Sequence, residues 1–162
     1  MFECLSDPRV HEHLDRCPPA TAAELARQFA RKLAGPPSDL GERWLNLVVR
    51  LRNCATLIGR LEATIVESRT EVAYLFGPEY WGQGYAQEAM LAFQQYLTQS
   101  WGVGEFWATT SPRNERSIRL LRRLAYSETP GPWPPLGSYD AGDLVFALRR
   151  HNVGSKVIHV EH

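Results

Sequence analysis

Neither sign of charge is in excess in this sequence. It contains 18 Lys and Arg against 18 Asp and Glu, so its formal net charge is zero. A domain that binds nucleic acid or an anionic membrane over its whole surface carries surplus positive charge. Nucleic-acid-binding and membrane-binding proteins of this kind are therefore disfavoured. No apolar run approaches the roughly 20 residues that cross a bilayer. The opening segment MFECLSDPRV also lacks the basic and apolar stretches of a signal peptide.

Cysteine is scarce as well. Cys4, Cys17 and Cys54 are odd in number and widely spaced, which argues against a disulfide framework and favours a reducing compartment. We therefore expect a cytoplasmic protein. His11 and His13 lie near two of these cysteines, but their spacing matches no metal motif, and we expect no metal.

What is present is a chain of 162 residues with 44% hydrophobic residues, which suits one compact domain. Caps and apolar spacing predict helices at 8–15, 22–34, 86–100 and 114–124. The third of these is expected to bury Ala89, Met90, Phe93, Tyr96 and Leu97. Runs rich in β-branched and apolar residues predict strands at 44–52, 56–67, 70–76, 105–110 and 144–148.

This order of elements is typical of an α+β fold with a mixed sheet, in which the first three strands form an antiparallel meander. We assign residues 1–150 to a single domain. Residues 151–162 form a C-terminal tail, and its segment KVIHV is a possible extra strand. The segment 130–142 holds four Pro and three Gly and is predicted to be an ordered loop.

The most specific local feature is LFGPEYWGQGYA at residues 75–86, which reads as a strand, a glycine-rich turn and the start of a helix. Gly82 and Gly84 let the backbone turn tightly, so that several free amides point toward one place. The helix that follows adds about half a positive charge at its N-terminus. Together these groups are suited to a pyrophosphate, although an ordinary strand-to-helix turn is the alternative.

Other phosphate loops fit less well. A Walker loop ends in Gly-Lys-Ser/Thr, and this loop has no Lys. A dinucleotide fingerprint needs a third glycine where this chain has Gln87, and it needs a parallel βαβ unit rather than a meander.

A second motif, NERSIRLLRRLAY, lies about thirty residues further along, at 114–126. Taken alone, it reads as a helix that Asn114 caps, with Ser117 in its first turn. At this spacing, the two motifs together resemble the GNAT superfamily of N-acetyltransferases. The resemblance is strongest to the branch that contains the ribosomal-protein N-terminal acetyltransferases.

The residues behind this resemblance span most of the chain, from about residue 6 to 150. The superfamily's phosphate loop reads Arg/Gln-x-x-Gly-x-Gly/Ala, which Gly84 and Ala86 match, whereas Trp81 stands in the Arg/Gln place. The branch's segment Tyr-Trp-Gly-x-Gly-Tyr-Ala is matched by YWGQGYA. Its later motif, Asn-x-x-Ser-x-x-Leu-Leu-x-x-Leu-Gly-Phe, is matched at Asn114, Ser117, Leu120, Leu121 and Leu124, with Ala125 and Tyr126 in place of Gly-Phe.

The resemblance implies a mostly antiparallel sheet with a splayed central strand pair, between which acetyl-CoA binds as co-substrate. It implies that backbone groups of Leu75, Phe76 and Gly77 contact the pantetheine arm and that Asn114 bonds this arm or the neighbouring strand. The pyrophosphate would be held by the loop of Trp81, Gly82, Gln83, Gly84, Tyr85 and Ala86. The implied activity is direct transfer of acetyl to a primary amine.

The acceptor amine must be neutral to attack. An α-amine with a pKa near 7.7–8 loses its proton easily at pH 7, whereas a Lys amine with a pKa near 10.4 needs about 4.6 kcal/mol. We therefore expect a protein or peptide α-amine, or a small-molecule amine, as acceptor. Glu71 on the central strand is the candidate general base, and the alternative is a surface Glu paired with Arg69 or Arg60.

The leaving thiolate also gains from a proton or a hydrogen bond. Many relatives use a Tyr seven positions after the Asn, but here that position is Leu121. In the resembling branch, a Ser at the position of Ser117 contacts the thiol, so Ser117 is the second catalytic candidate, with capping as the alternative. Trp133 and Tyr139, in the proline-rich loop, either shape the substrate pocket or merely pack.

Two departures leave alternatives open. The missing Tyr and the absent first strand leave a non-catalytic acyl-CoA-binding module as the alternative function. Binding of nucleic acid through the Arg-rich helix is disfavoured by the zero net charge and by the few aromatic residues between its arginines. The superfamily also usually begins with a strand that this chain lacks. The KVIHV segment, or a second subunit in a possible homodimer, would then cover the exposed edge beside the Trp44 strand.

Overall fold

The computed structural model describes residues 2–14, 17–37 and 40–150. Three N-terminal helices, α1 (Phe2–Ser6), α2 (Pro8–His11) and α3 (Ala22–Leu33), precede three strands, β1 (Arg43–Arg50), β2 (Leu57–Val66) and β3 (Arg69–Phe76). A 3-10 turn, η1 (Pro78–Tyr80), leads into α4 (Tyr85–Trp101) and β4 (Glu105–Thr110). Helix α5 (Glu115–Arg123) and strands β5 (Ser127–Glu128) and β6 (Leu144–Arg149) complete the chain.

Side-chain caps determine where the predicted N-terminal helices begin. The Asp7 carboxylate accepts the Arg9 N–H at 2.9 Å, ahead of Pro8 in the first turn of α2. The Thr21 hydroxyl accepts the Glu24 N–H at 3.1 Å at the start of α3. Both starts are confirmed, but α2 ends at His11 rather than at residue 15, and neither α1 nor the two-residue strand β5 is predicted from the sequence.

The six strands form one sheet in the order β1-β2-β3-β4-β6-β5. Every neighbouring pair is antiparallel except β3 and β4, which confirms a mixed, mostly antiparallel α+β fold. In the described residues, β1 pairs with a strand on one side only, and no strand precedes it. The tail segment KVIHV, proposed as cover for this edge, lies outside the described residues.

The central parallel pair separates after three residues, as expected. Its register joins Arg69, Thr70 and Glu71 of β3 to Glu105, Phe106 and Trp107 of β4. Beyond that point β3 stays paired with β2 as far as Phe76, and β4 stays paired with β6 as far as Thr110. The two strands therefore diverge toward their carboxyl ends and leave a gap between them.

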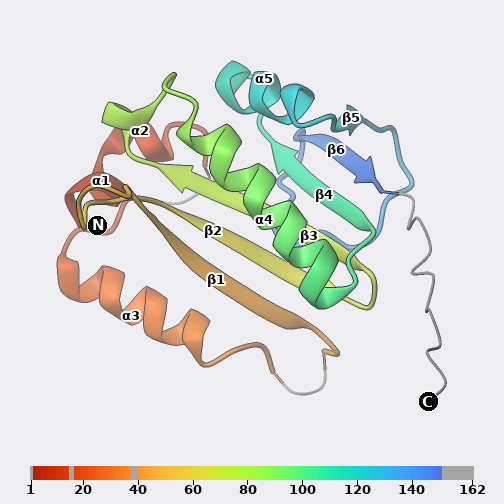
Figure 1. Ribbon diagram of the computed structural model, residues 1–162, viewed down its shortest axis with the longest axis horizontal. Coiled ribbons are helices and arrows are strands. Elements are labelled where there is room, and N and C mark those ends of the chain that lie inside the picture. Colours follow the sequence, from red (N-terminus) through yellow and green to blue (C-terminus); the bar gives the residue numbers. More distant parts are fainter. Residues whose placement is uncertain (1, 15–16, 38–39, 151–162) are drawn as a thin grey trace, which may run out of the picture.

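Helices cover both faces of this sheet (Figure 1). On one face, α4 and α5 pack on the main core, where Phe106, Phe146 and Met90 are completely buried. On the other, α1 and α3 enclose a smaller core of Cys4, Leu5 and Leu25 with the β3 side chain Leu75 packed against it. No helix in the described segments has the length and apolar character needed to span a bilayer.

The buried side of α4 matches the prediction in part, and Ala89 is only half-buried against the core. Met90, Phe93 and Leu97 are buried as expected, but Tyr96 is 44% exposed. Gln94 takes a buried place instead, because its amide donates to the Tyr126 hydroxyl at 3.1 Å and accepts from Arg150 at 3.0 Å. These two hydrogen bonds replace the ones to water that the Gln94 amide loses on burial.

Candidate active site

The glycine-rich loop between β3 and α4 requires left-handed backbone at two positions. Gly82 has φ 74° and Gly84, the N-cap of α4, has φ 88°. An added Cβ at either residue would meet nothing within 4 Å, so conformation rather than space favours glycine there. The first intrahelical bond of α4 runs from the Glu88 N–H to the Gly84 carbonyl at 3.0 Å. The amides of Tyr85, Ala86 and Gln87 precede it and are available to an anion at the helix N-terminus.

A cavity of about 600 Å³, which we call the donor cavity, lies between this loop, the end of β3, α2 and the start of α5. Its wall includes most of the cofactor-binding residues predicted from the sequence: Leu75, Phe76, Trp81, Gly82, Gly84, Ala86, Asn114 and Ser117. Segments far apart in the sequence thus meet around one cavity.

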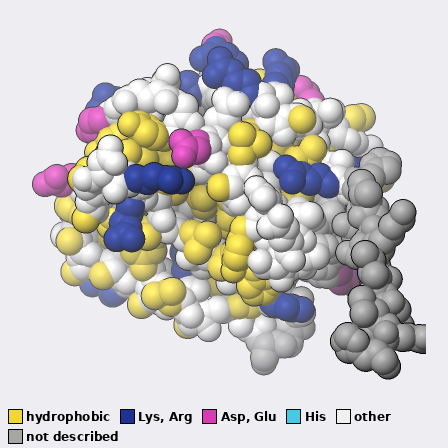
Figure 2. All heavy atoms as spheres, in the orientation of Figure 1, with side chains coloured by type: hydrophobic (Ala, Val, Ile, Leu, Met, Phe, Trp, Pro, Cys, Tyr) yellow, Lys and Arg dark blue, Asp and Glu magenta, His cyan; other side chains and the backbone are white. Residues whose placement is uncertain are grey.

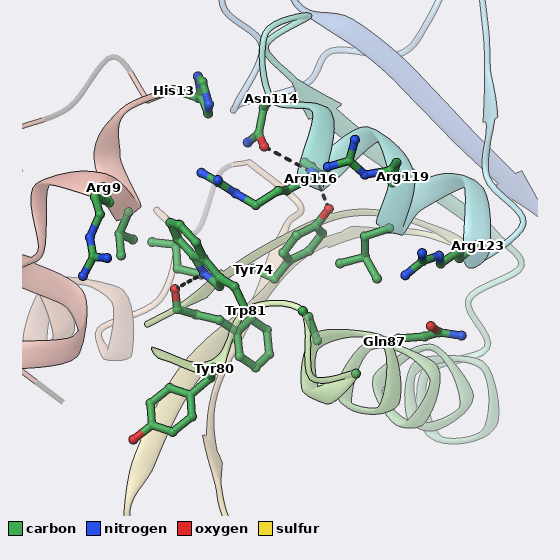
Figure 3. Close-up of a pocket in the computed structure, with 18 residues that line it drawn as sticks. Arg9, His13, Tyr74, Tyr80, Trp81, Gln87, Asn114, Arg116, Arg119 and Arg123 are labelled. Carbon is green, nitrogen blue, oxygen red and sulfur yellow. Dashed lines mark hydrogen bonds between the residues drawn. The ribbon is translucent and has the colours of Figure 1, made fainter. Parts of the chain in front are cut away.

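Arginines give the donor cavity its charge. Arg9 from α2 and Arg116, Arg119 and Arg123 from α5 line it, and no carboxylate does among the described lining residues. The arginine side chains converge on the cavity from two sides in Figure 3, and Figure 2 shows Lys and Arg side chains gathered over α5. Carboxylates just outside the lining partly compensate three of these arginines, because Arg9 pairs with Asp7 at 2.6 Å, Arg116 with Glu12 at 3.9 Å and Arg119 with Glu115 at 2.8 Å. The cavity wall itself carries only positive charge among the described arginine and carboxylate side chains, which suits an anion although the chain as a whole is neutral.

Trp81, which stands where the family motif has Arg or Gln, is held from two sides. Its indole N–H donates to the Phe76 carbonyl at 2.8 Å. The guanidinium carbon of Arg116 lies 4.0 Å from the centre of one of its rings, a cation–π contact. The Trp therefore ties the loop to the end of β3, and a positive charge reaches the loop from α5 instead of from the motif itself (Figure 3).

The start of α5 places two more predicted residues. The Asn114 side-chain oxygen accepts the Ser117 N–H at 3.1 Å, so Asn114 caps the helix while it lines the cavity. The Ser117 hydroxyl lies 2.7 Å from the hydroxyl of Tyr74 on β3. Burial raises the pKa of Tyr74 to about 12, and the Ser117 hydrogen bond opposes part of this rise.

Three predicted cofactor-binding residues lie outside the cavity lining. Gly77 donates its N–H to the Ile58 carbonyl at 3.0 Å and packs against Cys4, where a Cβ would have no room. The Gln83 amide donates to the Glu79 carbonyl. The Tyr85 ring packs edge-on against Tyr80 with ring centres 6.2 Å apart.

Glu71 lines a different cavity, of about 350 Å³, which we call the acceptor cavity. Because side chains alternate along a strand, Glu71 and Ala73 point to the opposite face of β3 from Tyr74. The Glu71 carboxylate accepts the Gly137 N–H at 2.7 Å, the Ser138 N–H at 3.0 Å and the Ser138 hydroxyl. Its partners are thus in the proline-rich loop, rather than the arginines considered from the sequence.

The two aromatic residues predicted to bind substrate lie on that loop but outside the described lining of both cavities. Trp133 and Tyr139 pack against each other, with ring centres 5.7 Å apart. The loop residues that do line the acceptor cavity are Pro134, Pro135, Leu136, Gly137 and Ser138. Tyr74 is not singled out by any sequence motif. The available signal was the alternation of side chains along the strand, which places Tyr74 on the face of β3 opposite to Glu71.

Comparisons with known proteins agree on one family. The profile of the acetyltransferase (GNAT) domain matches residues 1–127. An uncharacterized N-acetyltransferase, p20 of Bacillus licheniformis, is 25% identical over 126 residues, which are 76% of this chain and 69% of that protein. The uncharacterized protein YkkB of Bacillus subtilis is 35% identical over 80 residues, and this match spans only 46% of either chain.

Solved structures show the same fold. A GNAT-family acetyltransferase from Bacillus anthracis superposes with a TM-score of 0.70 at 22% identity, covering 92% of this chain and 86% of that one. Spermidine N-acetyltransferase from Vibrio cholerae, solved with CoA and spermine, superposes with a TM-score of 0.67 at 15% identity, covering 92% and 87%. With its profile match, its splayed strands and its glycine loop, the chain belongs to the GNAT family of acetyltransferases.

Proposed function

We propose that this protein transfers an acetyl group from acetyl-CoA directly to a primary amine. The observation that carries the proposal is the donor cavity, which lies beside the end of β3, where this strand has separated from β4, and is lined by the glycine loop and four arginines. A thioester carrier of this kind needs a slot for its arm and an anion site for its diphosphate. The loop amides and arginines supply the anion site, and the divergent strands supply the slot for the arm.

In the proposed complex, the pyrophosphate lies on the loop from Trp81 to Ala86 and the pantetheine arm runs along β3 past Leu75 and Phe76. The arm's far end then points toward Glu71 and Trp107, where the strands close. Each hydrogen bond to a charged oxygen contributes roughly 1.5–3 kcal/mol, so several loop amides suffice to anchor the diphosphate without a Lys.

The acceptor amine is proposed to enter through the acceptor cavity on the opposite face of β3. Its lining contains three carboxylates and two positively charged side chains, and therefore one negative charge in excess: Glu42, Glu62, Glu71, Lys32 and Arg69. Such a lining suits an amine with a single positive charge, such as a peptide α-amine, better than a polyamine with several charges. Polyamine acetylation, the activity named for the Vibrio cholerae neighbour, is therefore the second choice.

Glu71 is the proposed general base. An α-amine needs little help to lose its proton near neutral pH, so the base contributes most for amines of high pKa. Ser117 is proposed to contact the leaving sulfur from the donor side. Trp133 and Tyr139 remain proposed substrate contacts, and a place in the ribosomal-protein branch, a single domain over 1–150, a homodimer and a cytoplasmic location remain predictions.

Calorimetry with CoA, followed by acetyl transfer from acetyl-CoA to an amine panel, tests the proposal. The panel contains a short peptide with a free N-terminus, a lysine derivative with a blocked α-amine, and spermidine. We expect CoA binding, and faster acetylation of the peptide than of the other two amines. Binding without turnover on any amine would favour a non-catalytic acyl-CoA-binding module, which the buried Leu121 in place of the expected Tyr makes the rival function. Absence of binding would overturn both.

A further inference from the structure

Two hydroxyl groups from distant parts of the chain meet in the donor cavity. Tyr74 lies on β3 and Ser117 in the first turn of α5, 43 residues apart, and their oxygens are 2.7 Å apart. Both side chains line the cavity, and Figure 3 shows the Tyr74 ring pointing across it to α5. Neither the family motif nor the sequence pattern gives Tyr74 a role, so its place opposite Ser117 needs a separate explanation.

The position of this pair along β3 is informative. The strands close at Glu71, and a strand advances about 3.3 Å per residue, so Tyr74 lies about 10 Å from the closed end. A carrier with its diphosphate on the glycine loop would pass Phe76 and then Tyr74 before reaching that end. We place the carrier's sulfur beside Tyr74, about 10 Å short of that closed end, where it lies within reach of this pair.

The electrostatic setting favours negative charge there. Ser117 belongs to the first turn of α5, where the helix dipole is positive. Arg116 and Arg119 beside it also line the cavity, whereas their partners Glu12 and Glu115, at 3.9 Å and 2.8 Å, lie outside its lining. When an amine attacks the thioester carbonyl carbon, the carbon–sulfur bond breaks and its electron pair stays on sulfur, so a thiolate forms in this field.

We propose that Tyr74 donates its hydrogen bond to Ser117 and thereby directs the Ser117 hydroxyl hydrogen to the sulfur of the leaving CoA. Ser117 is then the catalytic residue that touches the reacting atom, and Tyr74 is a positioning residue that acts through it. The inference rests on the proposed function, because it needs the CoA sulfur in the donor cavity.

The acidity of the groups decides what the pair does. Burial raises the pKa of Tyr74 to about 12, and its phenol, like an ordinary one with a pKa near 10, stays protonated at neutral pH and remains a donor. An ordinary thiol has a pKa near 8.5, so the phenol proton does not move to the sulfur. The pair therefore stabilises the thiolate by hydrogen bonding, and the proton that the amine loses leaves by the acceptor side.

The test measures the thiol pKa of CoA bound to the full chain, from the ultraviolet absorbance of its thiolate as pH is raised. In the wild type, we expect a value below that of free CoA. Tyr74→Phe should raise the bound thiol pKa by about half a unit to one unit, a threefold to tenfold change in the ionisation constant. Ser117→Ala should raise it at least as much, and the double variant no more than Ser117→Ala alone.

Turnover provides the second readout. Tyr74→Phe should lower kcat about threefold to tenfold while KM for acetyl-CoA changes less than twofold, since the interaction strengthens as the sulfur becomes charged. Tyr126→Phe is the matched control, because it also removes a buried tyrosine hydroxyl, one bonded to Gln94 outside the cavity. It should leave both the bound thiol pKa and kcat near the wild-type values.

Each outcome is decisive. If the wild type binds CoA and Tyr74→Phe leaves both the thiol pKa and kcat unchanged, the inference is wrong and the proposed function stands. If Tyr126→Phe shifts them equally, the effect comes from general loosening of the core and the inference also fails. If the wild type binds no CoA, the proposed function fails and the inference with it.

Discussion

The Trp81 and Arg116 side chains meet at the place where the family motif has a single Arg or Gln. The motif places Arg or Gln at the start of the loop, whereas this chain has an indole that bonds the Phe76 carbonyl and carries the Arg116 guanidinium on its face. A cation–π contact of this kind contributes about 0.5–2 kcal/mol, depending on its exposure to water. The charge at the loop thus comes from α5, and the aromatic ring fixes where it lies.

Replacement of Arg116 tests whether the charge that α5 brings to the loop contributes to CoA binding. Arg116→Ala should weaken CoA binding about tenfold, which corresponds to roughly 1.4 kcal/mol, because one charged partner of the phosphates is lost. Calorimetric titrations at low and high salt should also show a weaker salt dependence for the variant. Arg122→Ala removes the same charge from the same helix outside the cavity lining, and serves as the control. Equal weakening by both variants would mean that only the overall charge of α5 matters.

Among the elements, α5 departs from the family pattern at its end. The motif has glycine after the last Leu, and this chain has Ala125, whose φ is 64°. The Leu124 and Ala125 amides donate back into the last turn, to Leu120 at 3.0 Å and Arg122 at 3.1 Å, so the hydrogen-bonded turn holds Ala125 in that conformation. A left-handed residue with a Cβ costs roughly 1–2 kcal/mol, so this helix end carries local strain.

Ala125→Gly should therefore stabilise the protein. Relief of the strain outweighs the larger conformational entropy of glycine in the unfolded chain, and we expect a net gain of about 0.5–1 kcal/mol in the free energy of unfolding. Urea denaturation measures it. Ala34→Gly, at the end of α3 where φ is −63°, offers the contrast and should lose stability. A loss with Ala125→Gly would show that the left-handed conformation carries no strain at this position.

At the scale of the whole molecule, Glu71 joins three parts of the chain. Its carboxylate accepts hydrogen bonds from the loop residues Gly137 and Ser138, and Thr109 on β4 donates its hydroxyl to the Ser138 carbonyl at 3.0 Å. The proline-rich loop is thereby tied to both strands of the splayed pair. A residue proposed as general base thus also holds the wall of the acceptor cavity.

Two substitutions separate these roles. Glu71→Ala removes the acceptor of both loop amides, so their hydrogen exchange should accelerate at least tenfold and about 1–3 kcal/mol of stability should be lost. Glu71→Gln keeps an amide oxygen as acceptor but cannot take a proton. It should therefore preserve much of the loop protection while slowing acetylation of a lysine-type amine about a hundredfold, and of an α-amine much less. If Glu71→Gln acetylates both amines at wild-type rates, Glu71 takes no part in proton transfer.

Features that depend on residues close together in the sequence are predicted well, whereas features that depend on contacts between distant segments are not. The Thr21 cap, the glycine loop and the order of strands depend on backbone preferences within a few residues, and the structure agrees with them. The Tyr96 prediction is wrong because burial of Gln94 in its place depends on Tyr126 and Arg150, which belong to other elements. Helical spacing within α4 carries no information about those partners.

The sequence by itself determined the fold class, the family and the place of the glycine-rich loop, because each depends on local patterns that hold wherever the segments lie. Only the tertiary structure decided which side chains meet: Tyr74 with Ser117, Arg116 with Trp81, and Glu71 with a loop 66 residues away. These contacts follow from strand register and from the direction of each strand face. A shift of one residue in β3 would exchange the faces on which Tyr74 and Glu71 lie, and no motif records that choice.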